Sequence, residues 1–453
     1  MKQRSKQTLD ARRAAFRILE HFFLEKKELE KAVNAVFSQT HLSEKDTRLA
    51  YEIVQGTLRR QQYLDQIIFR YLHAKFKNEE KVLIILRIAL YQMLFLDRVP
   101  NYSAVDEAVK MTKTICSFGL SRVVNGVLRN IEKDKKDRLA DVEKDMSPLE
   151  RLSVKYSHPV ELVQRWEARL GRPKTVKLLK FNARKPDIFV RRTMALTAEA
   201  TFRTEIASVA ATSRGQGYKN LYYRLKPGVR PIELDVFLGG HCTVQAPSSG
   251  WVVALLDIAE GDRIYDMCAA PGGKTTLMAD LCGETGHVYA GDLQWKRLEL
   301  LRENTKRLRQ RQVSSIALDA SVGGVSRLFN KILVDAPCSG TGVMHRYPDG
   351  RFFKGVDDIY TMAERQKKIL ATAAASLAPG GILVYSTCSL EDEENTGVIE
   401  AFLQEHHDFT LERAHPYVDS QYCTSKGYLS ITPYTHGMDG IFAARLRKKD
   451  ASN

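Results

Sequence analysis

The N-terminal part of the chain carries apolar side chains at helical spacing. Two well-marked stretches repeat mostly every three or four positions, namely Ala14, Ile18, Leu19 and Phe22, and later Leu83, Leu86, Leu90 and Met93. This is the period of a helix that buries one face. Strand-like alternation is almost absent between Thr8 and Glu132. The pattern predicts an all-α domain of roughly six or seven helices.

A polar stretch and then a mixed pattern follow. Residues 131–148 combine both signs of charge without an apolar face, so we expect a solvated linker there and assign residues 1–140 to the helical domain. Residues 148–240 alternate short helical and strand-like stretches. Helices are predicted at 159–170 and 198–209, and strands at 188–192 and 221–225. We interpret this segment as a small α+β module.

From Asp262 onward, apolar strands alternate with loops and helices. Strands are predicted at 263–268, 287–293, 315–319, 331–334 and 382–386. Parallel strands joined by helices form a doubly wound sheet with helices on both faces. Residues 241–449 are therefore predicted to form a Rossmann-like α/β domain. Three domains also suit a chain of 453 residues, because one core rarely serves so many.

Charge narrows the class of partner. The chain has 69 lysines and arginines against 54 acidic residues, a net charge of +15. Such a surplus favours a polyanion such as nucleic acid, although it could also serve solubility alone. No apolar run has the roughly 20 residues of a membrane span, and the first residues lack the apolar part of a signal peptide. We expect a cytoplasmic monomer with no membrane partner.

The cysteines do not form a metal or disulfide pattern. They lie at positions 116, 242, 268, 282, 338, 388 and 423, with no Cys-x-x-Cys pair and no histidine at zinc spacing. We expect free thiols and no metal. Most free cysteines are small buried hydrophobes, so a catalytic role has to be supported by their neighbours.

A small-residue turn follows the first predicted strand, in Asp266-Met-Cys-Ala-Ala-Pro-Gly-Gly-Lys-Thr-Thr276. Open α/β sheets bind ligands at this place. A phosphate-binding loop would need glycine where Cys268 stands, and the dinucleotide pattern Gly-x-Gly-x-x-Gly is absent. With these two nucleotide sites excluded, the turn predicts a site for an adenosine ligand that has no phosphate to bind. Asp292 and Asp319, which end the next two strands, would accept hydrogen bonds from ribose and adenine, unless each is only a turn residue.

Two cysteine loops follow the fourth and fifth strands. Asp335-Ala-Pro-Cys-Ser-Gly-Thr-Gly342 contains Cys338, and Ser386-Thr-Cys-Ser-Leu390 contains Cys388. Both thiols are thus expected beside the ligand, among Gly, Ser, Thr and Pro rather than inside an apolar strand. Pyrimidine methylation fits this pair, because carbon 5 becomes nucleophilic only after a thiolate adds to carbon 6. A second group would help to release the product, and Asp335 would hydrogen-bond the ring edge.

These three strings resemble the signature motifs of the RNA 5-methylcytosine methyltransferase family. The resemblance implies S-adenosylmethionine as methyl donor, Cys388 as nucleophile and Cys338 as the residue that assists product release. It also implies that a set of residues binds the cofactor, with Arg297 included by a looser analogy. These residues are Cys268, Ala269, Ala270, Pro271, Gly272, Gly273, Lys274, Asp292, Arg297, Asp319 and Asp335.

The helical domain resembles the NusB-like RNA-binding unit. The similar strings are Asp46-Thr-Arg-Leu-Ala-Tyr-Glu-Ile-Val-Gln-Gly-Thr-Leu-Arg, Leu90-Tyr-Gln-Met-Leu-Phe-Leu and Val124-Asn-Gly-Val-Leu-Arg. A NusB-like domain joined to this catalytic domain is similar to the RsmB type of enzyme, which implies 16S ribosomal RNA as substrate. The chain departs from the family pattern at Ala246, at Arg192-Thr193 and in Asp439-Gly-Ile-Phe442. These departures concern the target nucleotide, because none touches the two cysteines.

A base must leave its stack to be methylated, so we expect a single-stranded or flipped cytosine between the two cysteine loops. The basic helix over 296–311 is one possible RNA contact. The central module is the favoured one, through Arg191, Arg192, Arg203, Arg214, Lys219 and Arg224. Two alternatives stay open. One is a methyltransferase for transfer RNA or protein, and the other is an inactive RNA-binding regulator, which should have lost a cysteine or a cofactor acid.

Overall fold

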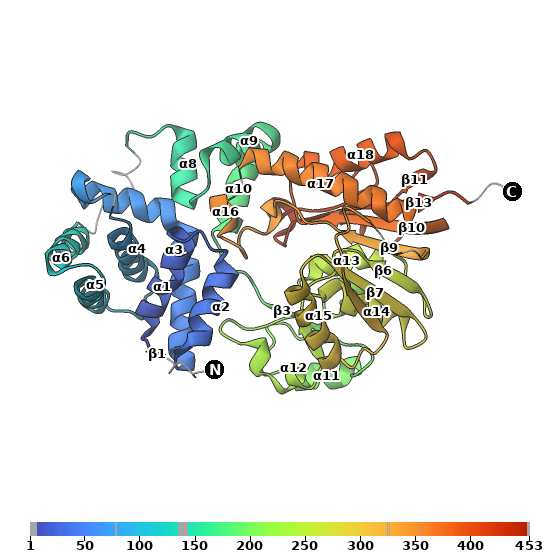
Figure 1. The fold of residues 1–453 in the computed structure, drawn as a ribbon, viewed down its shortest axis with the longest axis horizontal. Coiled ribbons are helices and arrows are strands. Elements are labelled where there is room, and N and C mark those ends of the chain that lie inside the picture. The colour runs from blue at the N-terminus through green and yellow to red at the C-terminus, as the bar shows by residue number, and fades with distance from the viewer. Residues whose placement is uncertain are drawn as a thin grey trace. The chain divides into compact units, whose positions relative to one another are not determined.

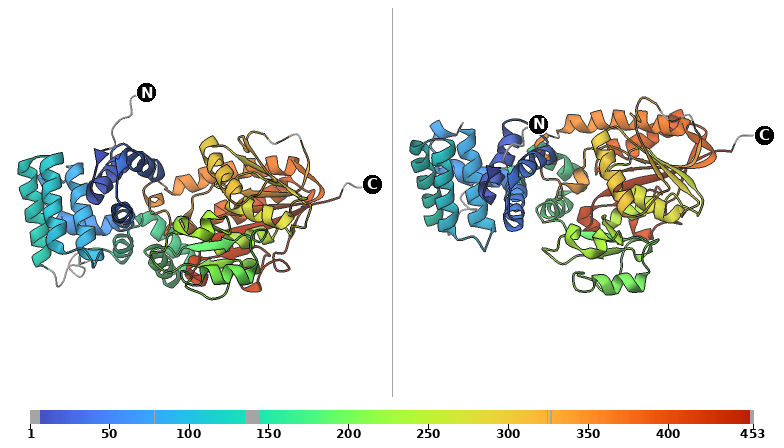
Figure 2. Two further views of the ribbon diagram at one scale, coloured as in Figure 1. Left: turned by 90° about the horizontal axis from the view of Figure 1, so that it is seen from below. Right: turned by 60° about the horizontal axis from the view of Figure 1, so that its bottom comes forward.

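The computed structural model describes residues 7–77, 79–134, 144–323, 325, 327–353 and 355–450. By compactness the chain divides into two units (Figure 1). The first comprises Met1–Arg184 together with Tyr347–Phe353, and the second comprises Lys185–Arg346 and Lys354–Asn453. Figure 2 shows from two further directions that the first unit is built almost entirely of helices, whereas the large sheet belongs to the second.

The first unit confirms the predicted all-α pattern. Its helices are α1 (Ala11–Phe23), α2 (Leu29–Gln39), α3 (Glu44–Tyr71), α4 (Glu80–Phe95), α5 (Asn101–Ile115), α6 (Phe118–Lys133), α8 (Pro148–Tyr156), α9 (Val160–Leu170), α10 (Arg172–Asn182) and α16 (Gly350–Phe353). Two short strands, β1 (Gln7–Thr8) and β2 (Thr40–His41), pair in parallel. Of the expected linker, residues 131–133 belong to α6, and residues 135–143 lie outside the described part of the chain.

Helix α4 forms the centre of this unit because it is apolar on nearly every side. Its residues from Val82 to Gln92 are all buried. Such a helix is stable only when other helices surround it. The one charge in this run, Arg87, forms an ion pair with the buried Asp65 at 2.6 Å, which compensates for its removal from water.

Helix α16 joins this unit through Arg351 and through Phe352, whose ring packs against Phe22 and Phe23. The Arg351 guanidinium donates to the carbonyl oxygens of Asn182 at 2.7 Å and Arg59 at 3.0 Å, and also to those of Tyr156 and Ser157. Burial lowers the pKa of Arg351 to about 9. These carbonyls lie in α3 and at the ends of α8 and α10, so one side chain binds three helices.

The second unit begins with a small sheet. Strands β3 (Phe189–Arg192), β4 (Tyr222–Arg224) and β5 (Cys242–Val244) form it in the antiparallel order β4-β3-β5. Helices α11 (Glu199–Ile206) and α12 (Asp235–Leu238) accompany it. The strands predicted at 188–192 and 221–225 and the helices predicted at 159–170 and 198–209 are confirmed, the former helix as α9 of the first unit.

The large sheet has the order β11-β13-β10-β9-β6-β7-β8, with β12 paired to β13. Its parallel strands are β6 (Arg263–Asp266), β7 (His287–Asp292), β8 (Val313–Ala317), β9 (Phe329–Asp335) and β10 (Leu377–Thr387). The predicted Rossmann-like sheet is thereby confirmed. Its edge is antiparallel, however, in β11 (Phe409–Glu412), β12 (Leu429–Ile431) and β13 (Ile441–Lys448), so the sheet is mixed rather than wholly parallel.

Helices cover both faces of the large sheet. Helices α17 (Val356–Ala375) and α18 (Thr396–Glu405) pack against Ile332 and Val334 of β9 on one face. Helices α13 (Pro247–Ala254) and α14 (Gly273–Cys282) pack against Leu333 on the other. Helix α15 (Trp295–Arg307) covers Ala290 of β7, and α19 (Pro433–His436) precedes β13. Because successive strand residues point to opposite faces, both faces are apolar and the polar side chains collect at the strand ends.

Candidate active site

The loop between β6 and α14 is held tightly. The amide of Ala269 donates to the Gly291 carbonyl at 2.8 Å, and Thr275 Oγ1 donates to Asp266 Oδ2 at 2.7 Å. Gly272 has a φ of +103°, and a Cβ atom there would lie 3.0 Å from the Leu301 side chain, so both conformation and space require glycine. The glycine therefore lets the loop pack closely against α15.

Asp266 is a buried acid at the start of this loop. Burial raises its pKa to about 7, although the Thr275 hydrogen bond opposes the shift. Its Oδ1 atom is buried and has no hydrogen-bond partner in the described part of the chain. A buried carboxyl oxygen without a partner is costly, and a donor from a ligand would satisfy it.

Asp292 and Arg297 brace the same loop. Asp292 accepts hydrogen bonds from the amides of Ala270 at 3.1 Å and Gln294 at 3.0 Å. Arg297 donates to the Ala270 carbonyl and lies 3.7 Å from Asp292. The structure thus brings together Ala270, Asp292 and Arg297, which the sequence assigns to the cofactor site. In the structure these three residues contact one another.

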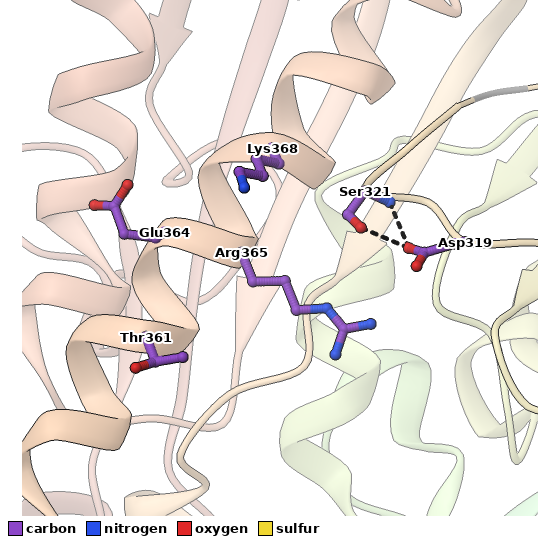
Figure 3. Close-up of a pocket in the computed structure, with 6 residues that line it drawn as sticks. All are labelled: Asp319, Ser321, Thr361, Glu364, Arg365 and Lys368. Carbon is purple, nitrogen blue, oxygen red and sulfur yellow. Dashed lines mark hydrogen bonds between the residues drawn. The ribbon is translucent and has the colours of Figure 1, made fainter.

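A pocket of about 480 Å³ opens beside Asp319 (Figure 3). Asp319 accepts hydrogen bonds from the hydroxyl and the amide of Ser321, which lower its pKa, and the charge of Arg365 lowers it further. Arg365 extends from α17 into the space before the turn containing Asp319, and Thr361, Glu364 and Lys368 complete the lining. The sequence does not reveal Arg365, because α17 carries many charges and nothing in its sequence marks the one that faces this pocket.

The two cysteine loops meet at the ends of β9 and β10. Asp335 pairs with Ser386 in the parallel ladder, so both loops leave the sheet at the same level. The Sγ atoms of Cys338 and Cys388 are 3.3 Å apart. The Gly342 amide donates to the Cys388 carbonyl at 2.9 Å, which fixes one loop on the other.

Asp335 links these loops to the glycine-containing loop. Its Oδ2 atom lies 2.6 Å from Lys274 Nζ, and its Oδ1 accepts a hydrogen bond from Ser386 at 2.7 Å. Burial alone would lower the pKa of Lys274, but the charge and hydrogen bond of Asp335 raise it above its ordinary value. Lys274 therefore stays protonated, and it interacts electrostatically with Cys388 as well.

Burial raises the pKa of four other thiols of this unit, those of Cys242, Cys268, Cys282 and Cys423. It raises the pKa of Cys242 to about 12 and that of Cys282 to about 11. These thiols stay neutral, and those of the fully buried Cys242 and Cys282 serve packing. All seven cysteines are free. Among the described residues, no group of His, Cys, Asp or Glu is placed to hold a metal ion, and no helix is long and apolar enough to cross a membrane.

The late Asp439-Gly440 motif proves to be part of the site. The Gly440 amide donates to the Gly342 carbonyl at 2.9 Å. Asp439 lies 2.6 Å from Arg346 and 3.0 Å from His345, and these two partners hold its pKa below the ordinary value although burial opposes them. The motif thus anchors the chain that follows Cys338.

The favoured RNA contacts in the central module need a correction. The Arg191 side chain is fully buried and pairs with Asp280 at 2.9 Å, so it cannot hold RNA. Arg192 donates to the Thr197 carbonyl at 2.6 Å. In α15, Arg307 donates to the carbonyls of Phe237 and Cys242 at 2.7 and 2.8 Å. Their positive charge was visible in the sequence, but the partners that the fold gives them were not.

Comparison with known proteins confirms the resemblance. The family model described as 16S rRNA methyltransferase RsmB/F matches residues 253–447, and the NusB family model matches residues 9–133. The probable ribosomal RNA small subunit methyltransferase B of Synechocystis sp. is 33% identical over 450 residues, which cover 97% of this chain and all of the relative. The protein of the same name from Bacillus subtilis is 33% identical over 425 residues, with 92% and 94% covered.

Solved structures agree on the fold. The crystal structure of PH0851 matches with a TM-score of 0.80 at 24% identity, and the match covers 98% of this chain and all of that one. The similarity therefore extends over both units. The chain belongs to the RsmB/F family of 16S rRNA methyltransferases, with a NusB-family domain in its N-terminal part.

Proposed function

We propose that this protein transfers a methyl group from S-adenosylmethionine to carbon 5 of a cytosine in 16S ribosomal RNA, through a covalent adduct with Cys388. The observation that carries the proposal is the 3.3 Å separation of the Cys338 and Cys388 sulfurs, with Asp335 at the end of the same strand as the Cys338 loop. Two thiols, a carboxylate and an ammonium at adjacent strand ends suit nucleophilic addition to a pyrimidine.

The cofactor would be held by the loop from Cys268 to Lys274 and by Asp292, Arg297, Asp319 and Asp335. The unpartnered Oδ1 of Asp266 and the pocket beside Asp319 suit a ligand that combines an ammonium group with an adenosine. When bound, S-adenosylmethionine supplies an electrophilic methyl group. The braced loop would shape the site and exclude water from the transfer.

The protein's own residues would carry the remaining steps. The Cys388 thiolate adds to carbon 6, and the electron pair of the ring double bond moves toward carbon 5. The Lys274 ammonium stabilises both the thiolate and the charge that develops on the ring. Asp335, held by Lys274 and Ser386, accepts a hydrogen bond from the ring edge.

Product release needs a second group. After carbon 5 has taken the methyl group, its proton must leave and the carbon 6 to sulfur bond must break. Cys338 is close enough to Cys388 to take this proton while the electron pair re-forms the double bond and expels the Cys388 thiolate. One chain contributes every residue that these steps use, so we propose that the active form is a monomer.

Ribosomal RNA is the proposed substrate because the full-length relatives bear that substrate in their names. The net charge of +15 suits a polyanion. Phosphate contacts are proposed for the NusB-like domain (1–140) and for the exposed Arg203, Arg214 and Lys219 of the central module (148–240), with the catalytic domain at 241–449. A cytoplasmic location is part of this proposal, because ribosomal RNA is found there.

The test is incubation of the protein with radiolabelled S-adenosylmethionine and protein-free 16S ribosomal RNA. Wild type is compared with Cys388→Ala and Cys338→Ala. We expect label in 5-methylcytosine from wild type, none from Cys388→Ala, and a denaturant-stable protein–RNA adduct from Cys338→Ala. Label from Cys388→Ala would overturn the nucleophile, and absence of label while the cofactor binds would overturn the substrate.

A further inference from the structure

Glu394 is a buried acid that makes no contact with the proposed cofactor loop. It lies at the end of the short helix Asp392–Glu394 and is fully buried. Its Oε1 atom accepts hydrogen bonds from the Ser339 amide at 2.7 Å and from Gln366 Nε2 at 3.0 Å. Its Oε2 atom accepts hydrogen bonds from the hydroxyls of Ser339 and Ser389.

The two serine donors come directly after the two site cysteines. Ser339 follows Cys338 and Ser389 follows Cys388, so one carboxylate binds both cysteine loops. Gln366 of α17 also donates to the Pro337 carbonyl at 2.9 Å. The backbone is therefore held immediately before and immediately after Cys338.

The neighbouring Asn395 holds the other loop. It accepts a hydrogen bond from Thr387 Oγ1 at 2.6 Å and donates to the Ser389 carbonyl at 3.0 Å. These two residues stand on either side of Cys388. Glu394 and Asn395 together thus fix the backbone around both thiols, and only Glu394 reaches both loops.

A buried carboxylate with four donors is a strong constraint. Hydrogen bonds to an ionised acceptor are shorter and stronger than neutral ones. Removing the carboxylate would take away the acceptor of four buried donors. They are the backbone amide of Ser339, the side-chain amide of Gln366 and the hydroxyls of Ser339 and Ser389. The two loops would then lose their shared anchor, and the direct hydrogen bonds from Gly342 to Cys388 and from Leu390 to Thr341 would have to hold them together.

We propose that Glu394 is a positioning residue that fixes the Cys338 loop against the Cys388 loop, so that the second thiol stays aligned with the adduct on the first. Attack on carbon 6 needs Cys388 alone, whereas release of the product needs both thiols. Loss of Glu394 therefore slows release more than attack. This consequence for catalysis rests on the proposed function, but the restraint on the loops does not.

The first measurement is amide hydrogen exchange, which needs no RNA. Glu394→Ala is compared with wild type, with the near-isosteric Glu394→Gln, and with Glu400→Gln, which changes an exposed carboxylate of α18 paired with Lys426. We expect exchange in residues 336–342 and 387–391 to rise about tenfold or more in Glu394→Ala, less in Glu394→Gln, and not in Glu400→Gln. Strand β7 serves as an internal reference for folding. Unchanged exchange in both loops of Glu394→Ala would overturn the proposal.

The second measurement is the fraction of protein trapped on RNA during turnover. In Glu394→Ala we expect kcat to fall about 100-fold with a small change in KM, while the denaturant-stable adduct rises several-fold, as in Cys338→Ala. Glu394→Gln should recover part of the activity. A purely structural role would lower turnover and adduct together, and that result would overturn the positioning role. If exchange rises as expected but no RNA is ever labelled, the proposed function fails and the restraint stands.

Discussion

Lys274 Nζ and Asp335 Oδ2 lie 2.6 Å apart, and this ion pair joins the loop after β6 to the strand that leads to Cys338. Sequence analysis had placed both residues in the cofactor site. The pair also links the methyl-donor side of the site to the cysteine side. The ammonium remains charged, because Asp335 raises the pKa of Lys274 against the effect of burial.

Replacing Lys274 with methionine tests which side of the site it serves. The variant keeps the length of the side chain but removes the charge beside Asp335 and Cys388. We expect kcat to fall about 100-fold, because developing charge on the ring loses a preorganised cation. We expect the Kd for S-adenosylmethionine, measured by calorimetry, to change less than about threefold, because the substitution leaves the backbone of the Cys268–Lys274 loop in place and the Lys274 side chain pairs with Asp335.

The matched control is Lys331→Met, which breaks a similar ion pair with Asp262 at the opposite end of the strands. It should leave kcat unchanged. If the Kd of the Lys274 variant rose strongly while kcat was preserved, the Lys274 side chain would serve cofactor binding alone. That result would contradict its proposed role in stabilising charge on the ring.

Arg365 is expected to support cofactor binding. It forms part of the pocket beside Asp319, and its charge helps to keep that acid ionised. We expect Arg365→Ala to raise the Kd for S-adenosylmethionine about tenfold. Lys367→Ala changes a cation of the same helix that does not line the pocket, and it should bind as wild type does. Equal affinity in the two variants would remove Arg365 from the site.

The sequence predicted the parallel strands and both cysteine loops for one physical reason. Apolar runs that end in small polar residues mark buried parallel strands, and the carboxyl ends of such strands meet at one edge. That reasoning places Cys338 near Cys388 without any knowledge of distances. It failed for β13, because that strand contains Arg445 and Arg447, which interrupt the apolar pattern and pair with Glu412 of β11.

Long-range polar partners explain the other differences. Arg191 looked like a phosphate contact, yet Asp280 neutralises it from a helix that lies far along the chain. Glu394 belongs to an acidic run that reads as a solvated turn, and its donors come from loops after β9 and β10. Polar pairs of this kind form only in the folded chain, and no local sequence pattern predicts them.

The buried Asp266 should make stability depend on pH. Its pKa is about 7 in the folded protein against 3.8 as the ordinary value, mainly through burial. The folded protein therefore binds this proton more tightly, and the free energy of unfolding falls as pH rises from about 4 to 7, by up to about 4 kcal/mol. Asp266→Asn has no such proton. In urea unfolding at several pH values, the free energy of unfolding of the variant should rise relative to that of wild type between pH 4 and 7. If the difference between the two free energies stayed constant from pH 4 to 8, the pKa shift of Asp266 would be contradicted.

The ion pair between Arg191 and Asp280 should matter for stability rather than for RNA. Both side chains are fully buried, and Arg191 also donates to Thr276 Oγ1 at 2.9 Å. Asp280→Ala leaves a buried guanidinium without its counter-charge, so we expect a loss of about 3 to 5 kcal/mol in urea unfolding. The double variant Arg191→Met/Asp280→Leu removes both charges and should recover much of that loss. Glu400→Ala, at an exposed pair, should have no measurable effect. If Asp280→Ala unfolded like wild type and lost RNA affinity instead, Arg191 would have to be reassigned to the RNA contact.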